Sequence, residues 1–382
     1  MFKGLSIFPA TKEQAVESRS RSYEAWGRPF GMEMEGYLDR KNDYGGYEMA
    51  KEGRWTTWVL APRGDPETLD FMCSCETLRR ETVVSTQAGS DYKSESQVGY
   101  GVASVFTPPQ NRGKGYAKHM MRLLHWVLAP ASSFSATFPE EWGQPPAIPE
   151  GFGTGVVSVL YSDVGREFYK AAGPVPGEDG WVVGPHVITT WNLATSSLNA
   201  SNDTASGWRL LGKEQLQELW ERDSELIIDE TPSNLSSTNK KAFTFLPRKG
   251  LGEYLYRRTD WFVNKMEDSP KYWGMESKLN VGNTFVSWSY EMYPGHPKTL
   301  LVTRLRCPRA MLAELISVLV GYAKELGIDK VQAWNLSDEL KEECSKIGGD
   351  SVDAEEHLAS AKWYGKGDST VEWLNSEKFA WC

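Results

Sequence analysis

The sequence predicts an α/β (α+β) protein with two domains, each built on a mixed, mostly antiparallel sheet flanked by helices. The chain has 382 residues, and single hydrophobic cores stop growing at roughly 250–300 residues. Strand-like runs precede an amphipathic helix in the first half, and the order strand, strand, helix, strand, helix recurs in the second half. The second domain is therefore predicted to be a degenerate copy of the first.

The first predicted elements are a short strand and a capped helix. Residues 5–8 are apolar, and Thr11 and Gln14 have the spacing of a capping box, which predicts a helix running to Trp26. Runs of β-branched and alternating residues then predict three strands of an antiparallel meander. A second helix is predicted over residues 32–38, and the three strands over residues 56–60, 70–85 and 97–107.

A helix and two further strands are predicted after the meander. From Ala117 onwards, apolar residues recur at helical spacing, namely Met120, Met121, Leu124, Val127 and Leu128. Ser162 is predicted to cap another helix that runs through Tyr169. The strands before and after this helix are predicted over residues 156–161 and 182–193.

Residues 196–207 are small, polar and turn-forming, which is typical of a flexible connection. They are predicted to link a first domain, residues 1–195, to a second domain, residues 208–382. Within the second domain, strands are predicted over residues 284–291, 299–305 and 330–334, and helices from Pro308 to Gly327 and over residues 337–347.

The overall charge and the cysteine pattern exclude several classes of function. With 42 basic and 51 acidic residues the net charge is -9, the wrong sign for holding nucleic acid through its phosphates. No run approaches the roughly 18 apolar residues of a membrane span. The five cysteines are scattered and odd in number, which indicates neither a disulfide framework nor a zinc site. We expect a cytoplasmic protein without a membrane or nucleic-acid partner.

The segment between the third meander strand and its helix has the chemistry of a pyrophosphate site. It reads Gln110, Asn111, Arg112, Gly113, Lys114, Gly115, Tyr116 and Ala117. Gly113 and Gly115 lack side chains that would block phosphates, and the neighbouring arginine and lysine are cationic. A helix N-terminus adds unpaired backbone N–H groups and a partial positive charge. The alternative is a turn with two glycines and two solvated bases.

This loop matches the pattern Gln/Arg-x-x-Gly-x-Gly/Ala, and with a strand before it and a helix after it the chain resembles the GNAT superfamily of N-acetyltransferases. The resemblance implies a GNAT fold, a GNAT-like second domain, acetyl-CoA as cosubstrate and no metal. It also implies that backbone groups of Val105, Phe106 and Thr107 hold the pantetheine arm.

The same resemblance implies a catalytic acid. The superfamily pattern Asn-x-x-Ala-x-x-x-Tyr-x-x-x-Gly is matched here by Tyr169 and Gly173, whereas Ser162 and Gly165 depart from it. Tyr169 would protonate the departing thiolate, a role that suits a phenol with a pKa of about 10. The alternative is an aromatic side chain that only packs on the sheet.

The sequence does not single out the general base. Glu33 and Glu35 lie in the predicted second helix, which in GNAT proteins lines the acceptor site, and Glu76 lies on a neighbouring strand. All three are substrate-site candidates. The last residues are apolar and aromatic, which predicts a docked terminus. Some two-domain relatives insert their terminal carboxylate into the active site, so Cys382 is a further catalytic candidate, with a packed terminal strand as the alternative.

The whole chain resembles the fungal lysine N6-acetyltransferase family, through its Trp-rich second half, the segment 335–337 and the ending 377–382. This resemblance implies acetylation of the side-chain amine of free lysine in an acidic, aromatic acceptor pocket. Two alternatives stay open: acetylation of a protein N-terminus or lysine, and a non-catalytic CoA-binding scaffold. The sequence specifies neither an acyl-chain preference nor an oligomeric state.

Overall fold

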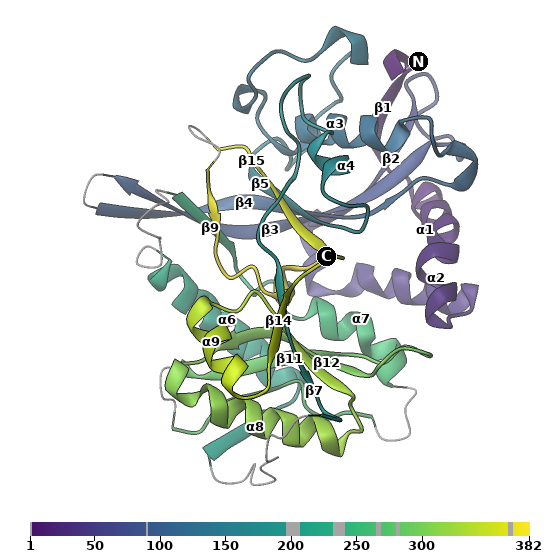
Figure 1. The fold of residues 1–382 in the computed structure, drawn as a ribbon. Helices are drawn as coiled ribbons and strands as arrows, with labels where there is room; N and C mark the ends of the chain where they lie inside the picture. Colours follow the sequence, from purple (N-terminus) through teal and green to yellow (C-terminus); the bar gives the residue numbers. More distant parts are fainter. Residues whose placement is uncertain are drawn as a thin grey trace.

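The computed structural model describes residues 2–88, 91–195, 207–231, 241–264, 269–279, 283–365 and 370–382. Two sheets form the centres of two lobes, and the C-terminus lies between the lobes near the middle of the molecule (Figure 1). None of the helices in these ranges combines the length and apolar character needed to cross a membrane.

The first sheet has the order β1-β2-β3-β4-β5-β15-β6, and β9 pairs with both β3 and β16. The pairs β1–β2, β2–β3 and β3–β4 are antiparallel, whereas the pair β4–β5 is parallel. The bounds are β1 Leu5–Pro9, β2 Trp55–Pro62, β3 Cys73–Ala88, β4 Asp91–Phe106, β5 Gly155–Ser162, β6 Val182–Val183, β9 Lys241–Phe245, β15 Leu358–Trp363 and β16 Glu372–Trp373.

Helices cover both faces of this sheet. The predicted capping box is present at the first of them, because the Gln14 backbone N–H donates to Thr11 Oγ1 at 3.2 Å and the Thr11 N–H donates to Gln14 Oε1 at 3.0 Å. The helix α3 buries Met120 and Leu124 against the strands, and each such side chain stabilises the fold by about 1.5–3 kcal/mol. The bounds are α1 Lys12–Trp26, α2 Met34–Asp43, α3 Tyr116–Leu128 and α4 Glu167–Lys170.

The second sheet has the order β14-β7-β13-β12-β11-β10-β8. The parallel pair β12 and β13 is connected through α8, just as β4 and β5 are connected through α3. The strands are β7 Val187–Asn192, β8 Trp208–Leu211, β10 Gly274–Ser277, β11 Phe285–Glu291, β12 Thr299–Arg306, β13 Lys330–Trp334 and β14 Asp350–Asp353. The helices are α6 Lys213–Glu230, α7 Tyr254–Val263, α8 Arg309–Glu325 and α9 Asp338–Lys346.

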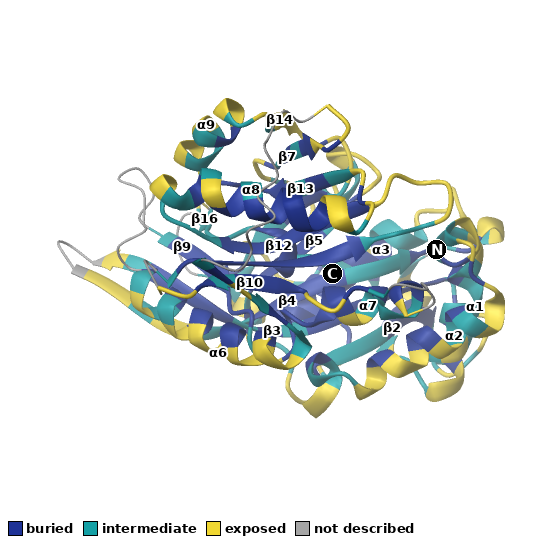
Figure 2. Ribbon diagram, turned by 90° about the horizontal axis from the view of Figure 1, so that it is seen from below, coloured by how far each residue is buried: buried dark blue, intermediate teal, exposed yellow. Residues whose placement is uncertain are grey.

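Buried residues form a band through both sheets, and exposed residues lie mainly on the outer helices and loops (Figure 2). One core lies between α3 and the first sheet, and a second lies between α8 and the second sheet. The predicted meander and the predicted helix after it are therefore confirmed, and each lobe has its own core as the chain length suggested.

Three predicted elements need correction. The helix capped by Ser162 does not form: Ser162 Oγ donates to the Gly165 carbonyl at 2.7 Å in a turn, Gly165 has a left-handed φ of 82°, and only the single-turn helix α4 follows. The strand predicted over residues 182–193 is divided between β6 and β7, which belong to different sheets. The second helix begins at Met34 rather than at residue 32 and continues past residue 38 to Asp43, and its last turn buries Arg40 and Lys41.

Sheet membership does not follow the predicted boundary between the domains. The predicted linker lies outside the described residues, apart from Gly207. The strand β7, which precedes the linker, belongs to the second sheet, whereas β9, β15 and β16, which follow it, belong to the first. The two lobes are therefore joined by exchanged strands.

Candidate functional site

The strands β4 and β5 diverge at one end of the first sheet. Their parallel pairing runs from Val98 opposite Gly155 to Gly101 opposite Val159, and no later pair joins them within the described residues. Beyond this point β4 contains a bulge, with Ser104 at a φ of 52° and a register shift against β3. A bulge leaves a residue outside the ladder and re-aims the backbone. The final residues of β4, including the predicted pantetheine segment 105–107, therefore border an opening in the sheet.

The predicted pyrophosphate loop lies at the same end of β4. Gly113 and Gly115 have φ values of 74° and 79°, a conformation that glycine adopts without steric cost. Asn111 Nδ2 donates to the Met72 carbonyl at 3.1 Å, and Arg112 Nε donates to the Thr107 carbonyl at 3.0 Å. These bonds fix the loop on the sheet, while Gly115 caps α3.

The N-terminus of α3 adds backbone N–H groups to this loop. The first N–H groups of any α-helix have no intrahelical partner, and the helix dipole is positive there. Gln110, Arg112, Gly113 and Lys114 are exposed, and Tyr116 and Ala117 form the partly exposed first turn. A β-carbon added at Gly113 would meet no atom within 4 Å. The loop thus presents backbone N–H groups and two cationic side chains to solvent.

Tyr169 lies on α4, after β5, and packs beside the ring of Trp181 with centroids 6.3 Å apart. Burial, together with the nearby Cys75 and Asp163, raises the pKa of the Tyr169 phenol. The phenol therefore keeps its proton at neutral pH, which is the state that a general acid requires.

The three candidate glutamates lie in different surroundings. Glu33 and Glu35 are exposed at the start of α2. Glu76 is only 5% exposed and lies opposite Ala103 of β4 in the ladder. Its Oε2 lies 3.7 Å from Lys41 Nζ, an ion pair that compensates the buried charge. Of the three, only Glu76 borders the diverging strands.

The C-terminal residues reach the same opening. Cys382 Sγ lies 3.4 Å from the Val102 carbonyl of β4, and Arg80 Nη1 donates to the Ala380 carbonyl at 2.6 Å. The Arg80 guanidinium lies against Gly101, where a β-carbon would be 2.5 Å from Nη2. Burial raises the pKa of the Cys382 thiol. The thiol is therefore protonated at neutral pH and is a poor nucleophile.

Tyr169 and Cys382 approach the first sheet from opposite faces. Successive residues of a strand point to opposite faces, so Cys75 and Glu76 of β3 mark the two sides. Cys75 lies in the core under α3 and acts on the Tyr169 pKa, whereas Glu76 acts on the Cys382 pKa. The predicted acid and the chain terminus thus lie on the two sides of the β4–β5 opening.

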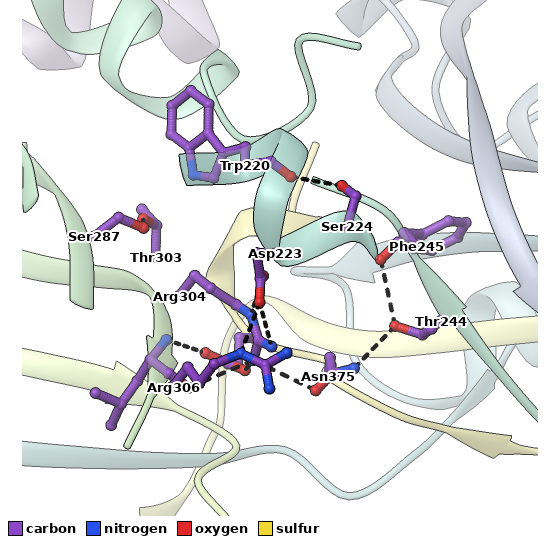
Figure 3. Close-up of polar contacts among 12 residues, drawn as sticks. Trp220, Asp223, Ser224, Thr244, Phe245, Ser287, Thr303, Arg304, Arg306 and Asn375 are labelled. Atoms are coloured by element: carbon purple, nitrogen blue, oxygen red, sulfur yellow. Dashed lines mark hydrogen bonds and ion pairs between the residues drawn. The ribbon is translucent and has the colours of Figure 1, made fainter. Parts of the chain in front are cut away.

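A buried ionic network fixes the terminal segment in place. Arg304 of β12 pairs with Asp223 of α6, Nε to Oδ2 at 2.8 Å, and also with Glu377. Glu377 Oε2 accepts from the Leu305 backbone N–H at 2.6 Å. Figure 3 shows Arg304 between Asp223 and Asn375, whose Nδ2 donates to Thr244 Oγ1 of β9 at 3.3 Å. Both lobes therefore hold the segment that ends at the opening.

Cationic and aromatic side chains surround the terminus. Lys378 Nζ lies 3.8 Å from the ring centroid of Trp334 and 4.6 Å from that of Trp381, and Arg258 Cζ lies 4.6 Å from the same Trp381 centroid. His357 Nδ1 lies 2.9 Å from Asp163 Oδ1. These side chains were not predicted from the sequence, because Arg258 of α7, Trp334 of β13 and the terminal residues are far apart along the chain and meet only in the folded structure.

Two surface recesses lie near this region. One, of about 750 Å³, lies between α2 and α7 and is lined by residues that include Arg40, Tyr47 and Asp260. The other, of about 1070 Å³, lies along β6 and β15 and includes none of the predicted site residues. The described residues contain no group of three or more His, Cys, Asp or Glu side chains that could hold a metal ion.

Comparison with known proteins gives concordant results. Residues 192–382 match the family model described as the LYC1 GNAT-like C-terminal domain. A curated Yarrowia lipolytica protein named "Lysine acetyltransferase" is 22% identical over 417 residues, which cover 97% of this chain and 98% of that protein.

Solved structures share the fold. A GCN5-related N-acetyltransferase from Kribbella flavida has a TM-score of 0.50 at 13% identity, covering 94% of this chain and 72% of that chain. One from Anabaena variabilis has a TM-score of 0.52 at 12% identity, covering 94% of this chain and 73% of that chain. The predicted fold class is confirmed.

Proposed function

The chain belongs to the LYC1-like family of GNAT acetyltransferases, and from this premise we propose that it transfers acetyl from acetyl-CoA to the side-chain amine of free L-lysine or a lysine-like small amine. The observation that carries the proposal is the contact of Cys382 with Val102, which brings the docked terminus to the opening beside the phosphate-type loop. The Yarrowia relative, which aligns along nearly the whole chain, is named a lysine acetyltransferase, and this name agrees with an amine of the lysine type.

The donor half of the site uses the backbone. The N–H groups at the start of α3, with Arg112 and Lys114, would hold the pyrophosphate of acetyl-CoA. The segment 105–107 would pair with the pantetheine arm along the unpaired side of β4, and backbone N–H groups near Val105 would stabilise the oxygen of the tetrahedral intermediate. Acetyl-CoA supplies the activated thioester.

The transfer is direct. The amine nitrogen forms a bond to the thioester carbonyl carbon, and collapse of the intermediate breaks the C–S bond. Tyr169 donates a proton to the thiolate, and a base takes a proton from the amine. The terminal carboxylate of Cys382 is the proposed base. Because the Cys382 thiol stays protonated, an acetyl-cysteine intermediate is disfavoured.

An acceptor screen tests this proposal. The full-length protein is incubated with acetyl-CoA and L-lysine, L-ornithine, polyamines or lysine-containing peptides, and release of free thiol is followed together with product mass. We expect thiol release with lysine and acetylation at its side-chain nitrogen. Acetylation of peptides alone would assign a protein acceptor instead, and ligand binding without thiol release would indicate a non-catalytic scaffold.

The role of the terminus is tested separately. A chain that ends at Trp381 and a chain extended by one glycine both displace the carboxylate, whereas Cys382→Ser keeps it in place. We expect the two displaced variants to lose turnover and the serine variant to retain it. Full activity of the shortened, folded chain would eliminate the terminal carboxylate as the base.

A further inference from the structure

Lys378 is a buried cation without a matching anion. The residue is only 3% exposed, and its Nζ lies over the indole rings of Trp334 and Trp381. Among the described residues, no carboxylate oxygen lies within 4.0 Å of Nζ. Lysines are almost never fully buried unless they are paired, so this position is costly and requires an explanation.

Trp381 has two further hydrogen-bond donors beside Lys378: the Arg258 guanidinium over its ring and its own indole N–H. Arg258 of α7 lies over Trp381 and is partly exposed, with no carboxylate at ion-pair distance in the described part of the chain. Trp381 Nε1 is buried and has no hydrogen-bond partner among the described residues. The ring thus brings together an ammonium, a guanidinium and an N–H donor, and all of these groups bind anions.

The carboxylates nearby do not neutralise these cations. Asp163 pairs with His357, accepting from both its ring nitrogen and its backbone N–H at 2.9 and 2.8 Å. Glu291 acts on Lys378 and Arg258 only from beyond ion-pair distance. Burial and the like charge of Arg258 lower the pKa of Lys378 to about 7. An added anion would restore the charged ammonium.

The residues around the terminus therefore form a cationic site. A pocket for a diamine, which carries only positive charge, would instead be acidic. The cations of this site outnumber its anions in the described residues: Arg40, Lys41, Arg80, Arg258 and Lys378 against Glu76, Asp163, Glu291 and the terminal carboxylate of Cys382. The chain as a whole carries a net charge of -9, so this local excess runs against the composition. It favours an acceptor that carries a negative group as well as an amine.

The position of Trp381 suits such an acceptor. Trp381 precedes Cys382, which contacts β4 at the opening, so an acceptor whose amine reaches the opening can extend its other end along Trp381. The butyl side chain of lysine separates its two ends in this way. Arg258, Trp381 and Cys382 all keep partial exposure, so the protein does not cover this side of the terminus completely.

We propose that Lys378, Arg258 and the indole N–H of Trp381 bind the α-carboxylate of the acceptor and so act as specificity-determining residues of the site. This inference rests on the proposed function. It distinguishes free lysine from a diamine, which lacks the carboxylate, and from a lysine within a peptide, whose carboxyl group is an amide.

The test compares acceptors that differ only at the carboxyl group. The kcat/KM values for L-lysine and L-lysinamide are measured by thiol release for the wild type, Lys378→Met, Arg258→Met and Lys378→Arg. Hydrogen bonds to charged groups contribute about 1.5–3 kcal/mol, so we expect the wild type to prefer lysine by about tenfold to a hundredfold. Both methionine variants should lose this preference mainly through the KM for lysine, and Lys378→Arg should retain most of it.

The outcomes separate the inference from the function. Lys362 lies on β15 and pairs with Glu178. The control variant Lys362→Met should leave the preference for lysine over lysinamide unchanged. If the methionine variants lower kcat/KM for lysine and for lysinamide by the same factor, the cations bind the chain's own terminus rather than the acceptor. The inference is then wrong, although the proposed function stands. If the wild type releases no thiol with any amine, the proposed function itself fails.

Discussion

Replacement of Lys378 by methionine should stabilise the protein at neutral pH. Burial lowers the pKa of Lys378 from 10.5 to about 7 in the folded state, so the unfolded chain binds more protons between these two values. Stability that is fully present above pH 10.5 is then lost as the pH falls towards 7. Methionine fills a similar volume without a charge and removes this loss.

The size of the effect follows from the pKa difference. Between the folded and unfolded pKa values, the free energy of unfolding of the wild type should fall by about 1.4 kcal/mol for each unit of decreasing pH. The whole shift from 10.5 to about 7 corresponds to a ceiling of about 5 kcal/mol. Asp163 and Glu291 partly offset the penalty and Arg258 adds to it.

Urea unfolding at pH 7, 8 and 9, followed by tryptophan fluorescence, measures this difference. The advantage of Lys378→Met over the wild type should shrink by about 1.4 kcal/mol per unit of rising pH. Lys378→Arg is the matched control, because arginine does not titrate in this range and should differ from the methionine variant by a constant amount. A pH-independent difference between wild type and Lys378→Met would show that the ammonium is not desolvated, and would remove the reason for assigning it an anion.

Three other substitutions test the donor site, the acid and the anchor of the terminus. Tyr169→Phe should lower kcat by about 10²–10⁴-fold with little change in the KM for acetyl-CoA, and unchanged turnover across pH would refute the acid assignment. Gly115→Ala forces an L residue to a φ of 79°, at a cost of about 1–2 kcal/mol. It should raise the KM for acetyl-CoA about tenfold, whereas Gly45→Ala, which meets no atom within 4 Å, should not. Glu377→Gln should lower the urea unfolding free energy by about 2–3 kcal/mol by weakening the buried pair with Arg304, and an unchanged midpoint would contradict the anchoring role.

The sequence predicted those elements that local chemistry determines. The capping box at Thr11 and Gln14 needs only the spacing of two side chains, and it formed as predicted. The helix after the meander has a continuous apolar face, and it packs on the sheet as expected. A left-handed glycine is also a local signal, and Gly165 was the departure from the family pattern where the predicted helix failed to form.

The residues that complete the candidate site could not be predicted in this way. Arg40, Arg258 and Lys378 are ordinary solvated charges when they are read along the chain. They become enclosed through contacts between segments far apart in sequence: Arg40 lies over Phe262 of α7, and Arg258 and Lys378 both lie over Trp381. A buried lysine that follows a buried glutamate, as Lys378 follows Glu377, carries no periodic signal.

The second lobe repeats the β4–α3–β5 unit as β12–α8–β13 but lacks its loop. Only Cys307 and Pro308 separate β12 from α8, and Pro308 has no backbone N–H, whereas residues 107–115 separate β4 from α3 and include two left-handed glycines. A proline at this position cannot help to form the N–H cradle that a pyrophosphate needs. The same strand β12 instead provides Arg304, which holds Glu377. The repeated unit in the second lobe is therefore better suited to fixing the chain terminus against the first sheet than to binding a second donor.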